Sequence, residues 1–145
     1  MAQKALNLED IVAGNIIQTK GIGSMTWLKD GERYSRLENN KQTGGTDIVA
    51  YRAKDNSREV IIPSSLLTDK STGRPIPVRS VSWSADNEKV LIYNNTRRVW
   101  RYDTRGDYWV LNLKDGALRQ LGKGMPESSM MFAKFSPDGT RVAYV

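Results

Sequence analysis

A short pattern that occurs three times constrains the fold of this chain more than any other feature. Each copy has an aromatic residue, two intervening residues and then Asp-Gly or Asp-Asn, within residues 25–34, 81–90 and 133–142. The aromatic positions Trp27, Trp83 and Phe135 lie 56 and then 52 residues apart. Asp-Gly and Asp-Asn accept the positive φ angles of tight turns, and apolar runs follow them. Each copy therefore predicts a β-hairpin.

A second kind of hairpin alternates with the first. Residues 48–61 match residues 108–121, and their turn residues Asp55 and Asp115 are 60 positions apart. Two hairpins per period make four strands per period, which is typical of β-propeller blades. A single all-β sandwich with regularly spaced turns is the alternative.

The predicted fold is therefore all-β, a partial β-propeller of about two and a half four-stranded blades. We expect a first blade at about residues 15–70, a second at 71–125 and the start of a third at 126–145. A short helical turn is expected over 7–12, ending near Gly14. Because propellers close with roughly four to eight blades, we expect the 145 residues to form an incomplete N-terminal propeller domain, a fragment of a larger chain.

The carboxylates of the repeated turns have a structural interpretation. They recur at equivalent positions, namely Asp30, Asp55, Asp86, Asp115 and Asp138. Side chains of Asp accept hydrogen bonds from the backbone two residues later and so form turns. We interpret these residues as turn formers and not as a metal or acid–base site.

Composition excludes several kinds of chemistry. The sequence has no Cys and no His, so disulfides, thiol nucleophiles, Cys-based metal sites and a complete Ser-His-Asp triad are excluded. No cofactor and no metal site is expected. The net charge is +6, but basic residues are spread from Lys4 to Arg141, so no nucleic-acid partner is expected. No run of apolar residues is long enough for a membrane segment.

Three segments carry a resemblance to a known family. Residues 6–14 read Leu-Asn-Leu-Glu-Asp-Ile-Val-Ala-Gly, residues 99–111 contain Trp100-Arg101 before a β-rich run, and residues 135–139 read Phe-Ser-Pro-Asp-Gly. Together they resemble the N-terminal propeller of dipeptidyl peptidase IV-type serine peptidases. In that family the propeller encloses the active-site cavity above an α/β-hydrolase domain, and dipeptides are released from peptide N-termini after Pro or Ala.

The resemblance implies a role for one residue. The Arg that follows the Trp in that family hydrogen-bonds a carbonyl of the bound dipeptide, and this role transfers to Arg101 alone. A guanidinium offers fixed, permanently charged donors to such an oxygen. The alternative for Arg101 is a structural ion pair with Asp103 or Asp107. We expect Trp100 to pack against the protein, and we expect Arg97, Arg98 and Arg105 to be solvated or structural.

Other parts of the family pattern are absent from this chain. The paired Glu residues that bind the free amino group of the substrate have no match, and Glu127 does not stand in such a stretch. The Gly-x-Ser-x-Gly nucleophile elbow is also absent. Whether the chain is part of an enzyme therefore depends on a parent polypeptide, because these residues alone have no catalytic site.

The resemblance also implies partners and a location. A peptide with N-terminal X-Pro, the catalytic α/β-hydrolase domain of a parent chain and a second copy are the expected partners. A periplasmic, extracellular or cell-envelope location follows from the same resemblance. Two alternatives of other classes remain: a non-catalytic propeller scaffold that binds protein partners, and a basic β-domain that binds nucleic acid.

Overall fold

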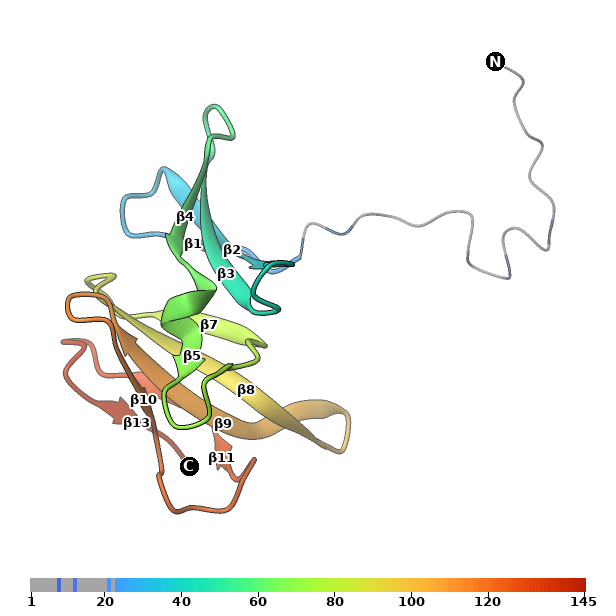
Figure 1. The fold of residues 1–145 in the computed structure, drawn as a ribbon, viewed down its shortest axis with the longest axis vertical. Helices are drawn as coiled ribbons and strands as arrows, with labels where there is room; N and C mark the ends of the chain where they lie inside the picture. Colours follow the sequence, from blue (N-terminus) through green and yellow to red (C-terminus); the bar gives the residue numbers. More distant parts are fainter. Residues whose placement is uncertain (1–7, 9–11, 13–20, 22) are drawn as a thin grey trace.

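The structure is a computed structural model that describes residues 8, 12, 21 and 23–145. The described part consists of antiparallel β-sheets joined by short connections (Figure 1). The all-β prediction is confirmed. The helical turn predicted over 7–12 lies outside the described residues, apart from two isolated positions.

The first sheet is a four-stranded meander in which neighbours in sequence are neighbours in space. Its strands are β1 (Thr26–Trp27), β2 (Arg33–Asn39), β3 (Thr46–Arg52) and β4 (Arg58–Ile62). The two predicted hairpin types are its two ends, since β1 pairs with β2 and β3 pairs with β4. In β3 the β-branched residues Ile48 and Val49 are fully buried, as suits a central strand.

A short linker joins the two large sheets. It contains the 3₁₀ helix η1 (Ser64–Leu67) and a small hairpin of β5 (Thr68–Asp69) and β6 (Arg74–Pro75). The linker is anchored by its apolar residues, because Leu67 and Ile76 are buried.

The second sheet repeats the meander. Its strands are β7 (Ser80–Trp83), β8 (Lys89–Val99), β9 (Tyr102–Asn112) and β10 (Ala117–Gln120), with the short β11 (Met130–Met131) paired to β9. A further hairpin follows, made by β12 (Lys134–Phe135) and β13 (Val142–Ala143). In propeller blades, strands that are consecutive in sequence are neighbours in one sheet. In β-sandwiches, by contrast, the chain crosses from one sheet to the other.

The interpretation of the five carboxylates as turn formers is confirmed. In each turn the Asp Oδ1 accepts a hydrogen bond from the backbone N–H two residues later, at 2.9 or 3.0 Å. The residue after the Asp has a φ between 57° and 69° in all five turns: Gly31, Asn56, Asn87, Gly116 and Gly139. Gly and Asn are the residues that tolerate this left-handed backbone.

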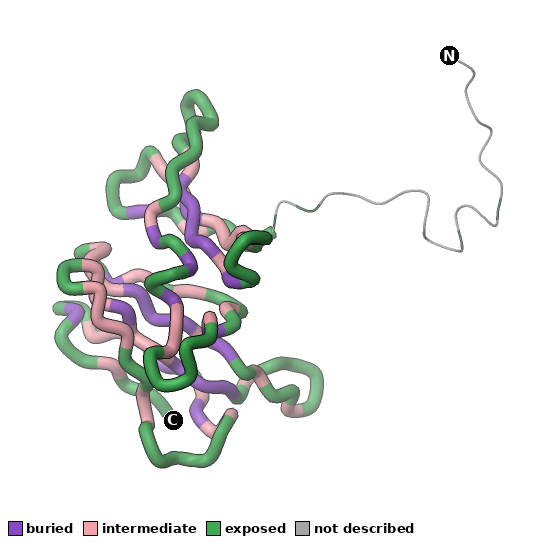
Figure 2. The backbone as a smooth tube through the Cα atoms, in the orientation of Figure 1, coloured by how far each residue is buried: buried purple, intermediate pink, exposed green. Residues whose placement is uncertain are grey.

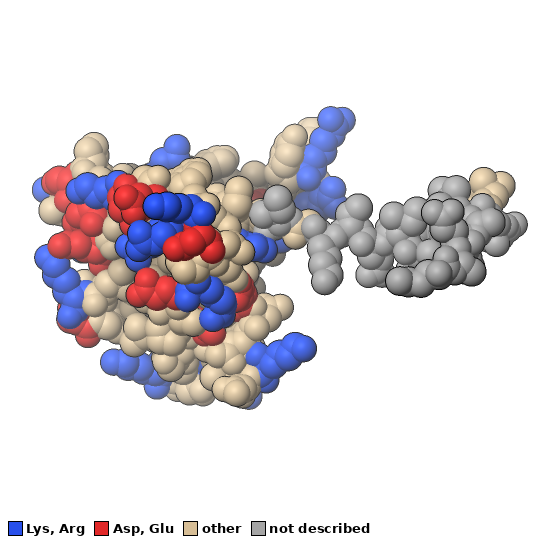
Figure 3. All heavy atoms as spheres, turned by 90° about the horizontal axis from the view of Figure 1, so that it is seen from above, with Lys and Arg blue, Asp and Glu red and all other residues tan. Residues whose placement is uncertain are grey.

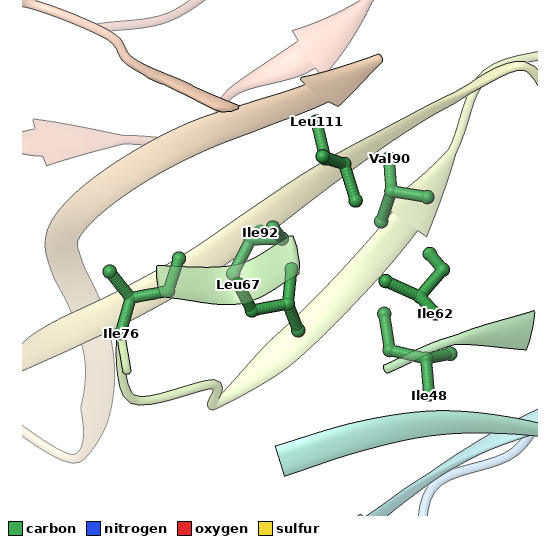
Figure 4. Close-up of a cluster of buried hydrophobic side chains, with 7 residues drawn as sticks. All are labelled: Ile48, Ile62, Leu67, Ile76, Val90, Ile92 and Leu111. Atoms are coloured by element: carbon green, nitrogen blue, oxygen red, sulfur yellow. The ribbon is translucent and has the colours of Figure 1, made fainter. Parts of the chain in front are cut away.

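The main core lies between the two large sheets (Figures 2 and 4). It consists of buried side chains from both sheets and the linker: Ile48, Ile62, Leu67, Ile76, Val90, Ile92 and Leu111. Strand β8 alternates its side chains, so Leu91 belongs instead to a second cluster with Tyr108 and Met130. Phe135 and Val142 of the last hairpin pack against that second cluster. The second sheet is therefore covered on both faces, as a blade between two neighbours is.

Candidate functional site

The second sheet carries a long hairpin arm, residues 95–105, formed where β8 and β9 continue past their neighbours. The last pair of β7 with β8 is Ser80 with Tyr93, whereas β8 and β9 stay paired out to Val99 with Tyr102. The ladder is interrupted between Asn94 and Arg97, so the arm is offset from the sheet by an irregularity in β8. Figure 1 shows the arm projecting from the sheet.

Trp100 and Arg101 form the turn at the tip of this arm. Trp100 has a φ of 60°, which is uncommon for a bulky residue and is shared by one other aromatic residue among those described, Phe132 at 55°. The side chain of Trp100 is 94% exposed, so the prediction that Trp100 packs against the protein is wrong among the described residues. The physical reason is that no other described strand runs beside the arm at its tip, so a side chain there has nothing to pack on.

Arg101 is exposed and borders an open hollow of about 460 Å³. The same hollow is bordered by Arg79, Tyr93, Tyr102 and Asp103. Within the described part of the chain the carboxylate of Asp103 pairs with the guanidinium of Arg79, at 3.7 Å, and does not pair with Arg101. Among the described residues Arg101 therefore forms neither of the ion pairs considered for it, with Asp103 or with Asp107. The substrate contact itself stays a prediction.

The base of the arm is held by a buried carboxylate, Asp107. Its Oδ1 accepts the backbone N–H of Ser128 at 2.8 Å, and its Oδ2 accepts the side-chain amide of Asn95 at 2.7 Å. The hydroxyl of Ser128 in turn donates to the carbonyl of Asn95 at 2.5 Å. These contacts join the start of the arm to the connection that follows β10.

Tyr93 holds the other side of the base. Its hydroxyl lies 2.9 Å from the carbonyl of Asp103 and 2.8 Å from that of Arg105. Burial, together with the neighbouring Tyr108 and Asp103, raises the pKa of Tyr93, so the hydroxyl keeps its proton and remains a donor at neutral pH. The ring stacks on Tyr108 with centroids 4.8 Å apart.

Sequence reasoning considered Asp107 only as an ion-pair partner of Arg101, and it missed both the bonds of Asp107 to Asn95 and Ser128 and the place of Tyr93. The signal for Asp107 was present in the repeat, since Asp47 holds the same position in the first sheet. Asp47 accepts the backbone N–H of Ser64 at 2.7 Å and the side-chain amide of Asn40 at 3.0 Å. An Asp that recurs 60 residues later, eight positions before each turn Asp, was visible in the sequence.

The charged side chains of the arm are exposed to solvent. Arg97, Arg98 and Arg105 are exposed, in agreement with their predicted solvated role. On the face shown in Figure 3, acidic and basic side chains are interspersed over much of the surface. Within the described ranges no three His, Cys, Asp or Glu side chains gather closely enough to hold a metal ion. Among the same residues, no helix has the length and apolar character needed to cross a membrane.

The class defined by these features is a partial β-propeller whose second blade carries an Arg-tipped arm. Residues 84–145 match the family model described as the dipeptidyl peptidase IV (DPP IV) N-terminal region. The crystal structure of Porphyromonas gingivalis dipeptidyl peptidase 4 matches the whole chain with a TM-score of 0.68 and 20% identity, and the match covers 20% of that protein's chain.

Curated relatives agree with this assignment. A probable dipeptidyl-aminopeptidase B of Aspergillus oryzae is 26% identical over 117 residues, which is 80% of this chain and 12% of the relative. Dipeptidyl aminopeptidase B of Saccharomyces cerevisiae is 26% identical over 145 residues, which is 93% of this chain and 16% of the relative. The chain thus spans about one eighth to one sixth of the length of these relatives.

The chain is thus similar to the N-terminal propeller portion of dipeptidyl peptidase IV-type peptidases. The predicted resemblance and the predicted partial propeller are confirmed. The blade boundaries at about residues 70 and 125 stay a prediction.

Proposed function

We propose that this chain is the non-catalytic propeller part of a dipeptidyl peptidase IV-like serine exopeptidase that releases N-terminal X-Pro or X-Ala dipeptides. In this proposal the propeller restricts access to peptide ends, and Arg101 anchors the substrate. The observation that carries it is the position of Arg101 at the tip of an arm, exposed and bordering an open hollow. A guanidinium presented in this way can donate to a peptide carbonyl without first breaking an ion pair to Asp103 or Asp107.

The test is substitution of Arg101 in the natural protein that carries this chain. We expect Arg101→Ala to lower kcat/KM for an X-Pro substrate about tenfold to a hundredfold, as loss of a charge-assisted hydrogen bond would. Arg97→Ala is the matched control, because Arg97 is an exposed arginine of the same arm away from the tip. If both variants keep the activity of the unmodified protein, the anchoring role is refuted.

Scaffolding of protein partners is the second candidate function. The observation that favours it is the pair of exposed aromatic residues at the tip, Trp100 and Tyr102. Tyr and Trp are enriched in the energetically dominant parts of protein interfaces. Two results together would favour this function over the first. The natural protein would not hydrolyse X-Pro substrates, and its Trp100→Ala variant would no longer bind a protein partner that the natural protein binds.

Location and assembly belong to the same proposal. We place the natural protein in the periplasm, the cell envelope or the extracellular space, as a homo-oligomer. The support is the resemblance to exported, commonly dimeric peptidases. Cell fractionation and the mass of the purified natural protein in solution test the two parts separately.

A further inference from the structure

We propose that Asp107 is a positioning residue for Arg101: through its bonds to Asn95 and Ser128 it fixes the direction of the arm and so the place of the guanidinium at the tip. This inference rests on the proposed function, because a positioned Arg101 matters for activity only if Arg101 binds substrate. The argument depends on three observations, namely the bonds at the base, the lack of support along the arm, and a matching cluster in the first sheet.

The bonds at the base converge on one buried group. Asp107 is 7% exposed, and its two carboxylate oxygens each accept one hydrogen bond, from Ser128 and from Asn95. Asn95 and Ser128 have positive φ angles of 44° and 52°. Hydrogen bonds donated to a buried carboxylate are strong and costly to leave unmade, so they hold both residues in these uncommon conformations.

Along its length the arm has little other support besides the exposed ion pair of Asp103 with Arg79 at 3.7 Å. Residues 95–104 are exposed or half-buried, and β7 and β10 end before the arm begins. The short β11 reaches only Arg105 and Gly106, at the base. The direction of the arm is therefore determined at its base, where Asp107 and Tyr93 act.

The length of the arm amplifies any change at the base. Arg101 stands six residues before Asp107, a span of about 20 Å in an extended strand. A rotation of about 10° at the base would displace the tip by about 3 Å over such a span. Displacements of this size are enough to break a directed hydrogen bond to a substrate carbonyl.

The first sheet offers a matched control for this inference. Asp47 is 8% exposed and accepts the same two kinds of bond, from the backbone of Ser64 and the amide of Asn40. Asn40 and Asp47 are 7 positions apart, whereas Asn95 and Asp107 are 12 apart. The longer connection between Asn95 and Asp107 forms the arm, whereas the one between Asn40 and Asp47 is a short loop. The two carboxylates therefore have the same local contacts, but only Asp107 supports an arm.

The experiment compares Asp107→Ala with Asp47→Ala in the natural protein, using an X-Pro substrate. Each variant loses the same two bonds, so both are expected to lower the unfolding temperature. Only Asp107→Ala is expected to raise KM, by about tenfold with kcat changed less than about twofold, because binding contacts rather than chemistry are lost. Asp107→Asn should restore KM, since an amide can still accept from Ser128 and can donate to a flipped Asn95 amide.

A second readout does not depend on activity. Hydrogen exchange of the backbone amides of residues 96–104 should be faster in Asp107→Ala than in the unmodified protein, and unchanged in Asp47→Ala. If Asp107→Ala does not fold, Ser128→Gly takes its place. That substitution removes only the hydroxyl bond to Asn95, and glycine suits the positive φ at this position.

The outcomes separate this inference from the proposed function. An Arg101→Ala variant without effect on kcat/KM would overturn both. An effect of Arg101→Ala without a larger effect of Asp107→Ala than of Asp47→Ala would overturn the positioning role and leave the proposed function standing. Equal exchange rates in the arm of both Asp variants would also overturn it.

Discussion

At Gly106 the strand β9 passes directly beneath the ring of Tyr93. A Cβ added at this position would lie 2.3 Å from the Cε2 atom of Tyr93 and 2.7 Å from the carbonyl oxygen of Asn94. Backbone atoms cannot withdraw, so only glycine fits without movement of the strand. This single position therefore sets how closely Tyr93 can approach the carbonyls at the base of the arm.

We expect Gly106→Ala to destabilise the protein by about 1–3 kcal/mol, which is typical of overpacking. Gly21→Ala is the control, because no described residue has an atom within 4 Å of a Cβ placed there. Urea unfolding of the two variants measures the difference. Equal stability of both would mean that the contact with Tyr93 relaxes at no cost.

The turn carboxylates act at the same scale and make stability depend on pH. The pKa values of Asp30, Asp86 and Asp138 are each lowered to about 2, first by hydrogen bonds from the side chains of Arg33, Ser84 and Ser136 and then by backbone N–H groups. The value in an unfolded chain is about 3.9. Because the folded values are the lower ones, this stabilisation is complete above the unfolded value and is lost as the pH falls from about 4 towards 2.

We expect the unfolding temperature of the protein to fall steeply between about pH 4 and pH 2. A triple variant with Asp30→Asn, Asp86→Asn and Asp138→Asn should lose less over the same range, because an amide still accepts the turn bond but does not titrate. Thermal unfolding at a series of pH values compares the two. Parallel losses in both proteins would contradict the assignment.

At the scale of elements, the linker and the arm show opposite ways of placing a connection. The 3₁₀ helix η1 packs Leu67 fully into the core beside Ile48 and Ile92, so the linker contributes to the contact between the sheets. The arm packs almost nothing and depends on polar contacts at its base. The linker joins two sheets, so it must pack against both of them. The arm instead carries Arg101 at its tip, and this side chain must stay exposed.

We expect Leu67→Ala to cost about 2–5 kcal/mol, the usual range for deletion of a fully buried leucine. Leu66→Ala should cost less than about 1 kcal/mol, because surface substitutions have small effects and Leu66 is 37% exposed. The two leucines are adjacent in one short helix, so chemical denaturation of this pair separates burial from helix propensity. Similar losses in both variants would show that the linker does not anchor the core.

At the scale of the whole molecule, the two sheets are joined by apolar packing and by one direct hydrogen bond between side chains. The indole Nε1 of Trp83 in β7 donates to the hydroxyl of Ser35 in β2 at 3.1 Å, 48 residues away in sequence. Ser35 is itself buried and donates to the carbonyl of Thr26. The repeated aromatic of the second blade thus reaches the second strand of the first blade.

A double-mutant cycle of Trp83→Phe and Ser35→Ala measures this bond between blades. We expect a coupling energy of about 0.5–1.5 kcal/mol, the usual net value of a hydrogen bond between neutral groups. Urea unfolding of the four proteins supplies the cycle. Additive losses would mean that packing alone couples the two sheets.

The hairpins, the four-stranded units and the resemblance to a known family could be inferred from the sequence. The environment of Trp100 at the tip of the arm could not. It assigned packing to Trp100, because large aromatic residues are usually buried. The side chain is exposed instead, since its position depends on how far β8 and β9 extend past β7 and β10. That extension depends on pairing between strands and has no local signal.

What the sequence determined by itself is local: an Asp whose side chain bonds the backbone two residues later, followed by a Gly or Asn that accepts a positive φ, makes a turn wherever it stands. Repetition of those turns then determined the strand order of each blade. The tertiary structure alone decided which carboxylates are buried, as Asp47 and Asp107 are, and where Arg101 stands. These features depend on contacts between residues up to 33 positions apart, such as Ser128 with Asn95, and such contacts exist only once the sheets and their connections have packed.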